Sequence, residues 1–199
     1  MKSKVVIFLD YQNIIKTSKQ FFNLNQLTHI SPTDLGQILL NRFKETREIK
    51  EIRVYKGIPS KRRQAKSYAS FNKRISKWKL DPKVTVISRP IAYPLGWPNK
   101  SMPGDKPREK GIDVKIAVDF VTMAIKKEYE IGILFSLDSD LKPALEFVCQ
   151  NNLDVKAEVI AWRTNRSHQL RLALSGNKPF CHWLTREDFS GMLLSNSST

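Results

Sequence analysis

The sequence predicts an α/β fold with a mainly parallel central sheet and helices on both faces. Short apolar runs alternate with segments of helical periodicity, which is the order expected where crossover helices connect parallel strands. A chain of 199 residues buries one good core but is short for two. We therefore expect a single domain over residues 1–194 and a disordered polar tail over residues 195–199.

The first strand is expected at residues 5–10, where five apolar residues end in Asp10. A helix start follows at Ser31-Pro32-Thr33-Asp34, because serine is a good N-cap and proline suits the first helical position. A basic helix is expected over residues 61–79, where apolar side chains recur at helical spacing. The remaining strands are expected at residues 52–56, 84–89, 131–136, 155–161 and 180–184, and the remaining helices at residues 113–127, 142–150, about 168–175 and after 184.

Residues 90–110 interrupt this pattern with five prolines and several lysines. A loop of this length within a compact domain is usually functional or mobile. We expect a Pro-rich basic loop that lies over a substrate. Its aromatic residues Tyr93 and Trp97 either stack on unpaired bases or pin the loop to the domain, and both readings remain open here.

The charge of the chain indicates a polyanionic partner. Lys and Arg number 34 against 19 Asp and Glu, a formal net charge of +15. Residues 51–110 carry 16 basic and 4 acidic side chains, whereas residues 111–150 carry 4 basic and 7 acidic ones. Each neutralised phosphate releases counterions and adds affinity, so the basic excess favours nucleic acid over a merely solvated surface. The acidic segment inside it needs a separate explanation.

Carboxylates at strand ends and helix starts supply that explanation. Asp10 ends the first strand, Asp138 and Asp140 follow the strand at 131–136, and Asp113 opens a helix whose apolar stripe faces the sheet. Ligands of open α/β sheets bind beyond the carboxyl ends of the strands. Carboxylates gathered there repel one another unless a divalent cation lies between them, and Mg²⁺ or Mn²⁺ prefers such oxygen ligands.

Each acidic residue also has an ordinary structural reading. Asp113 and Asp140 both stand where a helix cap is expected. Asp119 lies on the same helix as Asp113 but about 120° around it, so pairing with Lys115 is favoured over metal binding. His168 and His182 have no partner at ligand spacing and are interpreted as structural.

Three segments at these carboxylates resemble the motifs of NYN domains, the LabA-like branch of the PIN-like nucleases. They are VVIFLDYQNI (5–14), KGIDVKIAVDF (110–120) and SLDSDLKPALEF (136–147), and the resemblance spans roughly residues 4–162. It implies a PIN-like fold and a Mg²⁺ or Mn²⁺ site that cleaves RNA. By this resemblance Asp10, Asp113 and Asp138 match the metal-binding carboxylates, while Asn13 and Asp140 match the supporting polar positions.

The chain departs from the family pattern at Leu137, where the family usually has glycine. A turn that needs a positive φ there would be strained in leucine. The departure puts catalytic competence in question, although every carboxylate is in place.

Basic residues are expected to surround the acidic centre and bind RNA. Lys56 and the run at 61–66 follow the second strand, Lys110 precedes Asp113, and two arginines follow the fifth strand. For Lys73, Arg74 and Lys77 a solvated helix face is an equally good reading. The expected nucleic-acid contacts are Lys56, Lys61, Arg62, Arg63, Lys66, Lys110, Arg163 and Arg166.

The sequence therefore predicts a single-domain, metal-dependent endoribonuclease. A PIN-like RNA-binding module without activity is the first alternative. A haloacid-dehalogenase-type phosphatase is the second, and it is disfavoured because Gln12 stands where that chemistry expects a second Asp. The apolar run at residues 5–9 is too short for a signal peptide, and no stretch approaches the roughly 18 apolar residues of a membrane span. We therefore expect a cytoplasmic protein.

Overall fold

The computed structural model describes residues 2–43, 46–99, 104–151, 153–163 and 179–193. Its centre is a six-stranded, all-parallel sheet in the order β3-β2-β1-β4-β5-β6, which confirms the predicted α/β fold. The strands are β1 (Ser3–Asp10), β2 (Arg47–Ile58), β3 (Val84–Pro90), β4 (Ile131–Phe135), β5 (Lys156–Trp162) and β6 (Phe180–Leu184). The helices are α1 (Tyr11–Phe21), α2 (Pro32–Arg42), α3 (Ala65–Trp78), α4 (Ile112–Ile125), the 3₁₀ turn η1 (Ser139–Leu141), α5 (Lys142–Gln150) and α6 (Arg186–Gly191).

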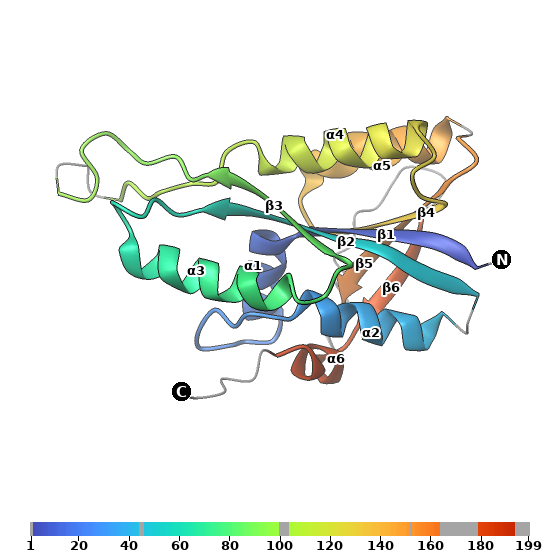
Figure 1. The fold of residues 1–199 in the computed structure, drawn as a ribbon, viewed down its shortest axis with the longest axis horizontal. Coiled ribbons are helices and arrows are strands. Elements are labelled where there is room, and N and C mark those ends of the chain that lie inside the picture. Colours follow the sequence, from blue (N-terminus) through green and yellow to red (C-terminus); the bar gives the residue numbers. More distant parts are fainter. Residues whose placement is uncertain (1, 44–45, 100–103, 152, 164–178, 194–199) are drawn as a thin grey trace.

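Helices cover both faces of the sheet (Figure 1): α4 and α5 lie on one face, and α1, α2, α3 and α6 on the other. Strand β1 is buried on both sides, with Val5, Ile7 and Leu9 in one core and Val6 and Phe8 in the other. Burial on both faces explains why β1 is continuously apolar instead of alternating. Among the helices that the structure describes, none has both the length and the apolar character to cross a membrane.

The sequence missed one helix and misplaced the start of another. Helix α1 follows Asp10 without a loop, because the Asp10 carboxylate caps it. Helix α3 begins at Ala65 instead of residue 61, since residues 60–64 form a turn in which Gln64 N donates to Ser60 O at 2.8 Å. The expected helix near 168–175 and the tail 195–199 lie outside the described residues.

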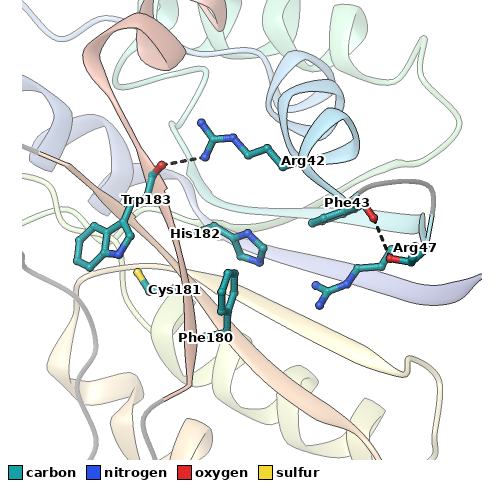
Figure 2. Close-up of a pocket in the computed structure, with 8 residues that line it drawn as sticks. Arg42, Phe43, Arg47, Phe180, Cys181, His182 and Trp183 are labelled. Carbon is teal, nitrogen blue, oxygen red and sulfur yellow. Dashed lines mark hydrogen bonds between the residues drawn. The ribbon is translucent and has the colours of Figure 1, made fainter.

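A buried charge cluster secures the sheet near the amino-terminal ends of its strands. Glu158 on β5 accepts two hydrogen bonds from Arg47, at 2.7 and 3.0 Å, and lies 2.7 Å from His182 Nε2. These hydrogen bonds outweigh burial and lower the pKa of Glu158. The cluster borders a hollow of about 360 Å³ in which His182 lies between the rings of Phe43 and Phe180 (Figure 2). The contacts of His182 agree with its structural interpretation.

We predict that Glu158→Ala destabilises the protein by about 3 kcal/mol, because it leaves the half-buried Arg47 guanidinium without its counter-charge and the buried His182 ring without its hydrogen-bond partner. Lys127→Gln is the control, since the Lys127–Asp154 pair is exposed on both sides and contributes at most about 1 kcal/mol. Urea unfolding of both variants measures the difference. Equal stabilities would contradict the structural role of the cluster.

Candidate active site

The carboxylate of Asp10 is buried at the carboxyl end of β1, with 7% of the residue exposed. Its Oδ1 accepts a hydrogen bond from Asn13 N at 3.2 Å, which makes Asp10 the N-cap of α1. Its Oδ2 accepts from the hydroxyl of Ser136 at 2.9 Å, directly after β4. Neither donor carries a charge. The negative charge of Asp10 is therefore solvated by dipoles and has no cationic partner among its hydrogen bonds.

Ser136 connects Asp10 to Asp138. Its Oγ donates to Asp10 and accepts from Asp138 N at 3.1 Å. Asn13 spans the same two strand ends, because its Oδ1 accepts from Leu137 N at 2.9 Å. The sequence placed Asp10, Asn13 and Asp138 at one edge of the sheet, and these contacts bring them together. Ser136 was not singled out, although a hydroxyl at the end of β4 is the available sequence signal.

Leu137 fits this turn without the strain expected of it. Among the described residues, the non-glycine positions with positive φ are Asn23, Lys127 and Asp154, so Leu137 is not one of them. Its side chain packs against the cores on both faces of the sheet. The departure from the family's glycine therefore brings no positive-φ strain at Leu137.

The carboxylates that cap helices are not the ones that the sequence suggested. Asp10 caps α1, and Asp138 caps η1 by accepting from Asp140 N at 3.1 Å. Asp140 is exposed, and α5 has Leu141 at its N-cap position. Asp113 lies in the first turn of α4, whose N-cap is Gly111 with φ 68°. The cap readings of Asp113 and Asp140 were therefore wrong.

Asp113 is half-buried and has no hydrogen-bond or ion-pair partner in the described part of the chain. Helix α4 packs against η1, which directly follows Asp138. Asp113 thus lies at the start of a helix that adjoins the site, while no hydrogen bond or ion pair joins its carboxylate to Asp10 or Asp138.

Glu109 is a site residue that the sequence reasoning missed. It pairs with Lys56 at 3.1 Å, and the Gln12 amide, turned so that its nitrogen faces Glu109, donates to both carboxylate oxygens at 2.7 and 2.8 Å. Gly57 makes room for it, because a Cβ there would lie 2.6 Å from Glu109 Cγ. The antiparallel bridge between Ala92 and Arg108 returns the long loop to this point. Only a three-dimensional structure reveals this position, since the loop separates Glu109 from β2.

Burial, helped by the negative charges of Glu109 and Asp138, raises the pKa of Asp10 to about 6 despite the lowering effect of its two hydrogen bonds. The other buried carboxylates, Asp119 and Glu158, have lowered pKa values because cations outweigh their burial. Asp10 is therefore the buried carboxylate that the described fold leaves without a counter-charge. Perturbed carboxylates of this kind are candidates for functional groups.

Asp119 has a structural role, as expected. It forms an ion pair with Lys115 on its own helix and also binds Arg53 at 3.1 Å and the Tyr55 hydroxyl at 2.9 Å. The pairing with Lys115 is confirmed, and the two partners on β2 fix α4 to the sheet. These contacts leave the metal-binding reading of Asp119 without support.

The expected basic rim divides into paired and free cations. Lys56 is committed to Glu109, and its ammonium lies 5.9 Å from the Tyr11 ring centroid. Arg63 stacks on Tyr93 at 5.0 Å. Arg166 lies outside the described residues. The remaining predicted contacts are exposed and pair with no carboxylate of the described chain: Lys61, Arg62, Lys66, Lys110 and Arg163.

Tyr93 pins the Pro-rich loop to the turn before α3. Its hydroxyl accepts from Ser60 N and donates to Gln64 Oε1, both at 2.8 Å. Trp97 packs against Tyr93, with ring centroids 5.2 Å apart. Of the two readings of Tyr93, the structure shows the pinning one.

The oxygen donors at this edge fit a hard divalent cation. Among the described residues no three His, Cys, Asp or Glu side chains lie close enough together to hold a metal ion. Mg²⁺ usually binds through one or two carboxylates and completes its shell with waters and substrate phosphates. Asp10 and Asp138 supply two carboxylates at neighbouring strand ends, where Ser136 bonds to the Asp10 carboxylate and to the backbone N–H of Asp138. This pair suits a cation that shares its coordination with a phosphate group.

Comparison with known proteins adds a family and a fold. The family model for the NYN domain matches residues 4–175. A crystal structure of a protein of unknown function from Vibrio parahaemolyticus RIMD 2210633 matches with a TM-score of 0.58 and 17% sequence identity, covering 97% of both chains. At that identity the likeness establishes the fold alone. No curated protein matches the chain in sequence.

We predict that Asp10→Asn stabilises the metal-free protein above pH 6. The pKa of Asp10 is about 6 in the folded protein and near 3.8 in the unfolded chain, so the folded state holds this proton more tightly. The cost of ionising Asp10 therefore grows between about pH 4 and pH 6, to about 3 kcal/mol. Asparagine removes this cost and remains a good N-cap.

The measurement is urea unfolding of both proteins in EDTA across pH 4–8. The stability advantage of Asp10→Asn should be small near pH 4 and full above pH 6. An advantage that does not change with pH would contradict the raised pKa.

Proposed function

This chain belongs to the NYN domain family of PIN-like nucleases, and on that premise we propose that it is a divalent-metal-dependent endoribonuclease. It would hydrolyse the phosphodiester bonds of RNA in the cytoplasm, a compartment that suits its free cysteines Cys149 and Cys181. The observation that carries the proposal is the contact between two neighbouring strand ends. Asp10 after β1 and Asp138 after β4 meet through the hydroxyl of Ser136, at the sheet edge where α/β proteins bind ligands.

In this proposal Asp10 and Asp138 hold Mg²⁺ or Mn²⁺, and Asp113 contributes the third carboxylate. Such a metal activates a water and stabilises the charge that develops on a scissile phosphate. Ser136 and Asn13 orient the carboxylates, since each bonds to both strand ends. The Lys56–Glu109 pair lies near the site, since the charge of Glu109 acts on Asp10. Asp140 is exposed next to Asp138 and supports it through its backbone N–H.

The charge distribution supports RNA as the substrate. The free cations Lys61, Arg62 and Lys66 lie beyond the carboxyl end of β2, Lys110 precedes α4, and Arg163 follows β5. All of these follow strands or precede a helix at the carboxylate edge. A polyanionic strand would be attracted by this surface, while a metal offsets the acidic centre.

One observation favours the alternative of an RNA-binding module without activity. Asp113 has no contact with the other carboxylates in the described structure, and no three acidic side chains there form a closed cluster. The two functions differ in what the Asp113 carboxylate contributes. Substitution of that residue therefore separates them.

We predict that Asp10→Asn, Asp113→Asn and Asp138→Asn each lower the rate of RNA cleavage about a hundredfold or more, because each removes a charged metal ligand. Binding of RNA in EDTA should change little. Asp154→Asn is the matched control, since Asp154 is exposed and, among the described residues, pairs with Lys127 alone. Full activity in any two of the three site variants would exclude the metal site, and an inactive wild-type protein that still binds RNA would identify a binding module.

We also predict that Mg²⁺ or Mn²⁺ raises the melting temperature, because bound metal relieves the unpaired charge of Asp10. At a hundredfold excess over Kd the stabilisation is about 3 kcal/mol. The shift should vanish in the Asp10→Asn/Asp138→Asn double variant and persist in Asp154→Asn. A thermal scan with no metal-dependent change at millimolar concentration would count against the site.

A further inference from the structure

A group of basic and aromatic side chains surrounds the ring of Tyr11, the residue directly after Asp10. His29 stacks on the ring with centroids 6.0 Å apart and planes 10° apart, and its Nδ1 lies 3.4 Å from the Tyr11 hydroxyl. Lys56 Nζ lies 5.9 Å from the same ring centroid. The ring of Trp78 packs against the Tyr11 ring, with centroids 4.7 Å apart. Four segments of the chain thus meet at a point that adjoins the candidate catalytic carboxylate.

Arg74 adds an unpaired guanidinium to this group. It lies one helical turn before Trp78 on α3, and its charge acts on both Tyr11 and His29. Its guanidinium donates a hydrogen bond to the Ser70 hydroxyl at 3.2 Å. No carboxylate in the described chain pairs with it.

Arg74 differs from the arginines of similar exposure in lacking a carboxylate partner among the described residues. Arg47 and Arg53, the other half-buried arginines of the described chain, each bind carboxylates through two or more hydrogen bonds. Burying a guanidinium without a counter-ion is unfavourable, and burial accordingly lowers the pKa of Arg74. Lys73 and Lys77 on the same helix are exposed, so the solvated reading suits them and not Arg74.

The surroundings are short of hydrogen-bond acceptors. Burial, together with the positive charges of Arg74 and Lys56, lowers the pKa of His29 to about 4. The indole N–H of Trp78 has no acceptor among the described residues. Donors and positive charge therefore gather here, while Glu109, which pairs with Lys56, is the carboxylate bound within the group.

We propose that Arg74 and His29, beside the paired Lys56, form a phosphate-binding subsite that holds a phosphate of the RNA strand other than the one cleaved. The inference rests on the proposed function, since it assigns a second contact of the same substrate. Arginine suits this role because its planar fork binds phosphate oxygens in pairs. The phosphate is either an internal phosphodiester or the terminal phosphate of the strand, and both present the same anionic oxygens.

The test compares equal losses of charge on neighbouring positions of α3. Arg74→Gln removes the unpaired guanidinium, and Lys73→Gln removes an exposed ammonium one residue away. Binding of one single-stranded RNA, with either a 5′-hydroxyl or a 5′-phosphate, is measured in EDTA over a series of salt concentrations. EDTA removes catalysis from the measurement, and thermal melting verifies that both variants fold.

We expect Arg74→Gln to weaken binding about tenfold and to reduce the salt slope by about 0.7, the value for one phosphate contact on a single strand. Lys73→Gln should change affinity about twofold or less. Arg74→Lys should recover part of the loss, because it keeps the charge without the fork. Equal losses for both RNAs identify an internal phosphate, and a loss confined to the 5′-phosphorylated RNA identifies the terminal one.

A second measurement needs no substitution at Arg74. A bound phosphate offsets the charges that act on His29, so RNA should raise the imidazole pKa from about 4 towards its ordinary value near 6.5. Proton NMR of the metal-free protein follows the signal, which His29→Asn identifies by its loss. Arg74→Gln behaving like Lys73→Gln on both RNAs, or an unchanged His29 pKa, would overturn the subsite alone. Failure of the wild-type protein to bind RNA would overturn the proposed function with it.

Discussion

The position of one buried carboxylate organises this end of the molecule. Asp10 ends β1, caps α1 by accepting from Asn13 N, and accepts from Ser136 directly after β4. A single side chain therefore holds three elements together. The arrangement is costly, because burial and two neighbouring carboxylates raise the pKa of Asp10 to about 6. A fold that needed only a helix cap would be served as well by serine or asparagine, which carry no charge. The ionisable side chain therefore points to a ligand of opposite charge.

The unpaired charge of Asp10 is the reason that Asp10→Asn is expected to gain stability while losing activity. The same region shows where prediction from the sequence succeeds and where it stops. The positions of the strands along the chain, the carboxylates at strand ends and the pairing of Asp119 with Lys115 depend on local periodicity and short spacings, which a sequence displays directly. Helix α1 was missed because Asp10 serves both as strand end and as cap. Glu109 was missed because its place depends on a missing side chain at Gly57 and on the Ala92–Arg108 bridge across a long loop.

The treatment of the other buried charges makes Asp10 distinctive. Asp119 is held by Lys115, Arg53 and Tyr55, and Glu158 by Arg47 and His182. Both carboxylates have lowered pKa values, because paired cations more than compensate for desolvation. The chain thus neutralises buried acids where their role is architectural. It has cations in excess, and among the described residues none forms an ion pair with Asp10.

Arg74 is the converse case, a half-buried cation that pairs with no carboxylate of the described residues, in a group built around the residue that follows Asp10. If these two unmatched charges were paired with each other, the fold would be more stable but neither would be available to a ligand. Because Asp10 and Arg74 are unpaired among the described residues, they suit an extended polyanion. One of its phosphates would share a metal ion with Asp10, and a second phosphate would bind the Arg74 guanidinium. Because these two contacts differ in kind, one through the metal and the other directly to the guanidinium, together they would fix both the position and the direction of the RNA strand. The unpaired charges at this edge therefore have a common explanation in one extended polyanionic substrate.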